Sequence, residues 1–151
     1  MNFIELNLEN VLKTLDNLSI DAKPSWGKMN AQQMIEHLTI GFKMSCGKIS
    51  FPSEINEELM AKMKLFLHSD KPMKRDVSVA FAPENPDLAN EELELAIDEF
   101  VIEWIDFEEY YQINPDNTNP HPYYGGLNYD EWCLLHKKHI THHFEQFGLI
   151  E

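Results

Sequence analysis

Four of the seven histidines in this 151-residue chain lie in one stretch, HKKHITHHFEQF (136–147). Imidazole nitrogens bind divalent metal ions and transfer protons near neutral pH. Residues four apart on a helix lie one above the other, so His139 and His143 can direct their rings to one point. This spacing predicts two ligands of a metal site on the last helix.

A third ligand must come from another element, because a zinc-type site that does chemistry generally has three protein ligands and an open position. His37 is the candidate, in the stretch QQMIEHLTIGF (32–42), on one helical face with Met34, Leu38, Gly41 and Met44. Gly41 lies one turn further along and removes a side chain where a ligand or substrate needs room. The predicted metal ligands are therefore His37, His139 and His143.

The histidines of the last helix are not equivalent on a helical wheel. His136 and His143 point into the apolar arc, which we expect to be buried, and His139 lies on its flank beside Gln146. On the same wheel, His142 lies nearer the polar side, which carries Lys137, Lys138, Thr141 and Glu145. Other candidates for a pocket or for contacts to the ligands are His136, His121, Tyr123, Gln146 and Glu103.

An alternative is that the histidines only pack in the core. A single inward histidine is more often a core residue than a ligand, but burying several imidazoles without partners costs free energy, and one cation satisfies all three. The zincin motif HExxH is absent, because Ile140 stands at the position of its glutamate. A zincin-type protease mechanism is therefore not supported.

Four segments with helical periodicity would position these residues, which predicts an all-α four-helix bundle over residues 1–151 as a single domain. The first helix is predicted over roughly residues 3–18, and the third from near Asn90 to the cluster NPDNTNPHP (114–122). The second and fourth have N-caps with a capping-box partner, Asn30 with Gln33 and Asn128 with Glu131.

An insert separates the second and third helices. It contains a short helical piece, NEELMAKMKLFLH (56–68), and then a stretch that we interpret mostly as loop. Alternation of period two is weak except around DVSVAFA (76–82).

Composition limits the function. The formal charge of −14 repels phosphate backbones and anionic lipid surfaces, so we expect neither a nucleic-acid nor a membrane partner. No leader or apolar span is evident, which predicts a soluble protein of the cytoplasm. The two cysteines, Cys46 and Cys133, form no close pair and are expected to be reduced.

The stretches WGKMNAQQMIEHL (26–38), HPYYGGLNYDEW (121–132) and HKKHITHHFEQFG (136–148) together resemble the DinB-like metalloprotein superfamily, of the type of the YfiT-like metal-dependent hydrolases and thiol-dependent transferases. In particular, they resemble an uncharacterised branch with HPYYGGL and HxxHHxxQFG motifs. The resemblance implies a four-helix bundle that holds zinc or nickel through His37, His139 and His143. It also implies an open coordination position for water or a low-molecular-weight thiol.

A thiol cofactor of this kind carries carboxylates, so its site needs cations. Basic residues of the insert could receive them, and these are Lys62, Lys64, Lys71, Lys74 and Arg75. The favoured alternative is a solvated patch that balances an acidic protein. Arg75 is the only arginine, which leaves little scope for bidentate carboxylate binding and weakens the transferase assignment.

Two hypotheses follow. The first is a cytoplasmic metalloenzyme, a transferase or hydrolase that acts on a small-molecule substrate by activating a thiol or water. The second is a non-catalytic helical bundle with a structural metal or none, which acts in protein association as a homodimer. A closed site with a fourth protein ligand, such as His136 or a glutamate, would favour the second.

Overall fold

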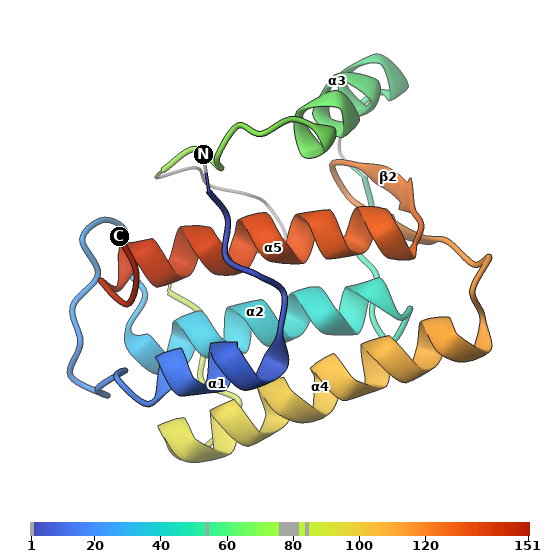
Figure 1. Ribbon diagram of the computed structural model, residues 1–151. Coiled ribbons are helices and arrows are strands. Elements are labelled where there is room, and N and C mark those ends of the chain that lie inside the picture. Colours follow the sequence, from blue (N-terminus) through green and yellow to red (C-terminus); the bar gives the residue numbers. More distant parts are fainter. Residues whose placement is uncertain (1, 54, 76–81, 84) are drawn as a thin grey trace.

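The computed structural model describes residues 2–53, 55–75, 82–83 and 85–151 (Figure 1). Within these ranges the chain is mostly helical and has one small antiparallel sheet. In chain order the elements are α1 (Leu8–Leu15), α2 (Ala31–Ser45), α3 (Glu57–His68), α4 (Leu93–Ile113), β1 (Asn119–His121), β2 (Gly125–Leu127) and α5 (Tyr129–Gln146).

Helix α2 lies between α4 and α5, and α3 packs on the outer side of α5 (Figure 1). The core between α2, α4 and α5 is rich in aromatic rings. Phe42 of α2 stacks on Trp104 of α4 at 5.0 Å between ring centroids and on His136 of α5 at 3.9 Å. Phe100 and Phe107 contact Phe42 edge-on. This packing fixes the distance between α2 and α5, the two helices that carry the candidate ligands.

Both predicted capping boxes are confirmed. The Asn30 side chain accepts from Gln33 N while the Gln33 side chain accepts from Asn30 N, and Asn128 and Glu131 repeat this exchange at the start of α5. Because each box fixes the first turn of its helix, it also fixes which residues of α2 and α5 face each other. The insert helix is confirmed as α3, with Asn56 as its N-cap.

The predicted first helix is too long at both ends. Its N-terminus is at Leu8 because the Asn7 side chain accepts from Asn10 N and caps it there, and its last residue is Leu15. The third predicted helix also begins later than expected, at Leu93.

Part of the polar side of α5 is buried, contrary to the prediction that only the apolar side is. Lys138 is 2% exposed, and its Nζ donates to three main-chain carbonyls, those of Phe66, Ser69 and Lys71, at 3.2, 2.8 and 2.6 Å. Thr141 is 1% exposed and its hydroxyl accepts from Ile4 N. The end of α3, the segment after it and the N-terminal segment therefore cover this side.

The two-stranded sheet was not predicted. β1 and β2 are antiparallel, with Asn119 opposite Leu127 and His121 opposite Gly125. The hairpin leads directly into the Asn128 cap of α5. The alternating stretch 76–82 lies, except for its last residue, outside the described residues.

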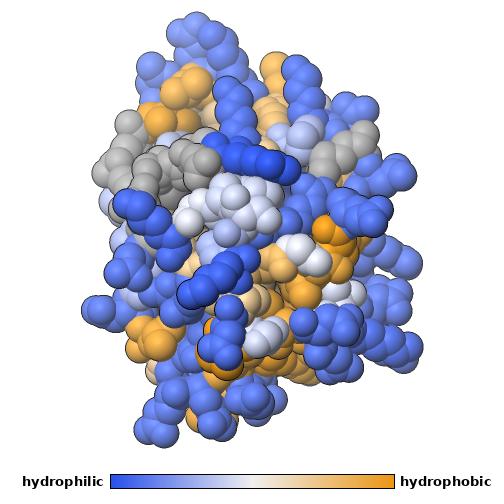
Figure 2. Space-filling view, turned by 90° about the vertical axis from the view of Figure 1, so that its left-hand side faces the viewer, coloured by the Kyte–Doolittle hydropathy of each residue, from blue (hydrophilic) through white to orange (hydrophobic). Residues whose placement is uncertain are grey.

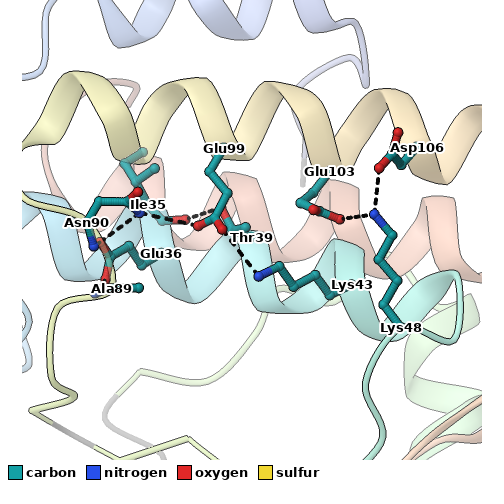
Figure 3. A network of polar contacts seen from close by, with 10 residues as sticks. All are labelled: Ile35, Glu36, Thr39, Lys43, Lys48, Ala89, Asn90, Glu99, Glu103 and Asp106. Atoms are coloured by element: carbon teal, nitrogen blue, oxygen red, sulfur yellow. Dashed lines mark hydrogen bonds and ion pairs between the residues drawn. The ribbon is translucent and has the colours of Figure 1, made fainter.

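A network of polar contacts joins α2 to α4 and to the loop before it (Figure 3). The buried Glu36 carboxylate accepts from Ala89 N, from the main-chain and side-chain nitrogens of Asn90, and from the Gln32 amide. Further along, Lys48 pairs with Glu103 and Asp106. Glu36 precedes His37, so this network also fixes the turn of α2 that carries the first candidate ligand.

Two expectations from composition can be compared with the structure. Cys46 and Cys133 are both free thiols, as predicted. No helix within the described part of the chain is long and apolar enough to cross a membrane. Figure 2 shows the end of the molecule at which α5 terminates, where hydrophilic side chains surround smaller hydrophobic areas.

Candidate metal centre

The three histidines predicted as ligands lie together between α2 and α5. Each offers one ring nitrogen, and these nitrogens lie within 4.8 Å of one another. The ring centroids are 4.6 Å apart for His37 and His139, 4.9 Å for His37 and His143, and 4.8 Å for His139 and His143. The three side chains are close enough to hold one metal ion.

His37 and His139 share a hydrogen bond, with 2.8 Å between their Nε2 atoms. One of the two nitrogens must therefore carry a proton and the other must accept it. Two imidazoles on one tetrahedral zinc ion place their ligand nitrogens about 3.3 Å apart. A cation can therefore replace this proton after a small separation of the rings.

The third imidazole is oriented by Gln146. His143 Nδ1 lies 2.7 Å from Gln146 Oε1, and the amide Nε2 of the same glutamine donates to the main-chain carbonyl of Trp26 at 2.8 Å. Since Oε1 can only accept, Nδ1 carries the proton and Nε2 of His143 keeps its lone pair. Gln146 was predicted as a candidate for contacts to the ligands, and the ligand candidate that it contacts in the structure is His143.

Gly27 leaves room for this glutamine. Its φ is +78°, and a Cβ built on it would lie 2.9 Å from Gln146 Nε2. Any other residue would be strained in the left-handed backbone and would also push the amide from its place. Glycine is therefore needed next to Trp26 if Gln146 is to orient His143.

All three imidazoles are held neutral. Burial, and then the charge of His142, lower the pKa of His37 to about 4. Burial, and then the charge of His37, hold the pKa values of His139 and His143 well below the ordinary value. Neutral imidazole is the form that binds metal, so the ligands are in the required state at pH 7.

Gly41 brings the backbone of α2 against the histidines of α5. A Cβ at this position would lie 3.7 Å from His139 Nδ1 and 3.8 Å from His136 Cε1, which is ordinary contact. The space that Gly41 leaves is therefore bounded by two imidazole rings and accommodates little more than a methyl group.

His136 lies next to the cluster but is not part of it. Its ring is 2% exposed and stacks between Phe42 and Trp132, and its Nε2 has no hydrogen-bond partner among the described residues. Burial lowers its pKa to about 3. The imidazole is therefore a neutral core ring at pH 7, and it is not among the three residues whose nitrogens converge.

His121 lies in the interior and not in an open loop. It ends β1, its side chain is 7% exposed, and its Nδ1 accepts from Tyr123 N at 3.0 Å. Its ring packs against Trp132 at 5.8 Å between centroids, and burial lowers its pKa to about 3. Tyr123 is half-buried beside it. Neither residue belongs to the convergent cluster.

Glu103, the predicted carboxylate candidate, is engaged elsewhere. It accepts from Lys48 Nζ at 2.8 Å on the α4 side of α2 (Figure 3). Glu108 likewise accepts from the Tyr129 hydroxyl at 2.6 Å. Among the described residues, the cluster brings together three imidazoles and no carboxylate or thiolate.

Sequence reasoning missed the role of Trp26. Its carbonyl anchors Gln146, and its ring packs against His142 at 5.3 Å and under the guanidinium of Arg75 at 3.9 Å. The signal available was the pair Trp26–Gly27 directly before the Asn30 cap, because a glycine next to a large ring indicates a close approach of the backbone to another element.

A model of the family described as protein of unknown function (DUF1569) matches residues 3–148. The chain belongs to the DUF1569 family. The match contains every element described above and all three histidines of the cluster. The comparisons found no match to this DUF1569 protein among curated proteins or solved structures.

Proposed function

We propose that this DUF1569 protein is a divalent-metal-dependent enzyme, a thiol-dependent transferase or a hydrolase of the cytoplasm, with His37, His139 and His143 as metal ligands. The observation that carries the proposal is the convergence of three neutral imidazoles from two helices on one point. Three imidazoles match the donor set of catalytic zinc sites, in which a fourth position is left for the reacting group.

The arrangement of helices supports a relationship to the DinB-like superfamily. α2 lies between α4 and α5, α1 adds Val11 and Leu15 to the same core, and we propose that these helices form its four-helix bundle, with α3 as the insert (Figure 1). One ligand on the second bundle helix and an HxxxH pair on the last are what the resemblance implies. The bundle holds these ligands on rigid helices and not on loops, which favours a fixed coordination geometry.

Zinc or nickel fits this donor set, because imidazole is a good ligand for both. A cation held there supplies Lewis acidity, which lowers the pKa of water or a thiol towards neutrality. The protein's own part is to hold the ligands. Gln146 fixes the tautomer and the orientation of His143, and whichever of His37 and His139 carries the shared proton on Nε2 would hold it on Nδ1 instead in order to offer Nε2 to a metal.

His37 and His139 keep part of their surface exposed although burial lowers the pKa of both rings, and we propose that small molecules reach a fourth position from that exposed side. The test is to load the protein with Co²⁺ and record its visible spectrum before and after adding 2-mercaptoethanol. Under the proposal, a thiolate-to-cobalt charge-transfer band appears in the wild type and is missing in His139→Ala. An unchanged spectrum on adding the thiol would mean that the fourth position is closed, and it would favour a structural metal.

A second candidate function is protein association without catalysis. The shared proton satisfies two of the imidazoles without any metal. In addition, α4 exposes large apolar side chains that are 43% to 78% accessible, and these are Leu95, Ile102, Ile105 and Ile113. Such an exposed stripe is typical of a helix that meets a partner, here a second copy in a homodimer. Light scattering of the wild type and of Ile102→Lys tests this, because a dimer through α4 would dissociate in the variant.

A further inference from the structure

A cavity of about 240 Å³ lies beside the three-histidine cluster, between α5 and the segment that follows α3. Its wall includes the apolar side chains of Phe3 and Met73 and the charged side chains of Arg75, Lys138 and Glu145. Pockets for drug-sized ligands usually exceed about 300 Å³. The cavity therefore fits a small molecule, or one end of a larger one.

His142 connects the cavity to the cluster. It lines the cavity, and its ring lies edge-on to that of His143 at 4.9 Å between centroids. On its other side the ring packs edge-on against Trp26. A molecule in the cavity is therefore one imidazole ring away from a proposed metal ligand.

Arg75 offers an available cation to this cavity. Its guanidinium lies 3.9 Å above the Trp26 ring, which holds it by a cation–π contact, and it makes no ion pair or hydrogen bond with any residue in the described ranges. The planar fork of its donors is therefore free to bind a carboxylate with two parallel hydrogen bonds.

Glu145 offers an available anion to the same cavity. It forms no ion pair with Arg75, nor with any other cation in the part of the chain that the structure describes. Lys138 adds positive charge to the wall, but its donors are used on the three carbonyls beyond α3. Within the described residues, the cavity thus presents one cation and one carboxylate that form no ion pair with each other.

We propose that this cavity binds a small zwitterion of the α-amino-acid type, with its carboxylate on Arg75 and its ammonium group on Glu145. This deepens the proposed function, on which it rests only for the link to a reaction at the metal. A ligand held by its charged end here directs the rest of the molecule along His142 towards the cluster. Glu145 would repel a purely anionic ligand, and Arg75 and Lys138 would repel a purely cationic one.

The experiment uses L-norvaline as the probe, with pentanoate and n-butylamine as analogues that lack its amine and its carboxylate. Each is titrated into the full-length protein by calorimetry and by tryptophan fluorescence. Trp26 is the reporter, because Trp104 and Trp132 are 3% and 0% exposed. The variants are Arg75→Gln and Glu145→Gln, and Lys74→Gln is the matched control, since Lys74 is exposed next to Arg75 but does not line the cavity.

We expect norvaline to bind the wild type and the control equally and both site variants about tenfold or more weakly, because each variant loses a charge-assisted hydrogen bond. Both analogues should bind the wild type more weakly than norvaline. The proposal is overturned if norvaline does not bind, if Arg75→Gln binds it normally, or if pentanoate binds as well as norvaline and Glu145→Gln has no effect. Metal content of the same samples is measured separately, so a failure of this site is distinguishable from a failure of the metal site.

Discussion

Removing the acceptor of Gln146 should weaken metal binding without removing a ligand. In Gln146→Leu, His143 Nδ1 loses the oxygen that now lies 2.7 Å away, so the ring is free to turn and to change tautomer. Loss of such an outer hydrogen bond typically costs a factor of about 10 to 100 in metal affinity. This corresponds to about 1.4–2.8 kcal/mol of binding free energy.

The assay is a competition titration against a chromophoric zinc chelator. Gln32→Leu is the control for the loss of a buried amide, because Gln32 is equally buried at 3% exposed and also bonds a main-chain carbonyl, that of Asn90, while its other bond is to Glu36 and not to a histidine of the cluster. Gln146→Glu keeps an acceptor oxygen and should retain most of the wild-type affinity.

Two results would refute the reasoning. If Gln146→Leu binds zinc as tightly as the wild type, the glutamine does not orient a ligand. If Gln32→Leu loses as much affinity as Gln146→Leu, the effect is one of general stability, and the contact with His143 is not its cause.

Three further predictions concern the cluster and its support. His136→Ala should bind zinc nearly as the wild type does while His143→Ala should not bind it; equal losses in the same titration would mean that the ligands are wrongly chosen. Glu36→Gln should lower the free energy of unfolding by about 2 kcal/mol at pH 7, because the carboxylate accepts from four donors. Burial alone would raise the pKa of Glu36, but these hydrogen bonds lower it below 4.5. The contribution of Glu36 to the free energy of unfolding is therefore present above pH 4.5 and lost as the pH falls through the lowered pKa. Urea melts of the variant and the wild type should then give the same free energy of unfolding in acid. A difference that stays constant with pH would contradict this. Lys138→Met should cost about 3 kcal/mol in the same melts, because three carbonyls lose their donor, and a loss below about 1 kcal/mol would show that water replaces it.

The starts of α2 and α5 and the histidine cluster could be predicted because their signals are local. A capping box depends on residues three apart, and both Asn30 with Gln33 and Asn128 with Glu131 form one. The cluster follows from helical periodicity. His139 and His143 are four residues apart and therefore share a face of α5, and His37 meets them where α2 packs against that face.

The burial of Lys138 and Thr141 on α5 could not be predicted, because the segments that bury them are far away in the sequence. Lys138 lies on a face that is polar by composition, yet it is buried under residues from before α1 and after α3. Local pattern does not show that a lysine will find three carbonyls. The predicted start of the first helix was wrong, since the cap at Asn7 decides it, and the contact of Gln146 with His143 was not predicted, since it depends on the room that Gly27 leaves.

The most direct test of the central claim is the metal content of tag-free protein by elemental mass spectrometry, with His139→Ala measured beside it. We expect close to one zinc or nickel ion per chain in the wild type and none in the variant. No bound metal in the wild type, even after incubation with both ions, would contradict it and would leave the three histidines as packed, hydrogen-bonded core residues.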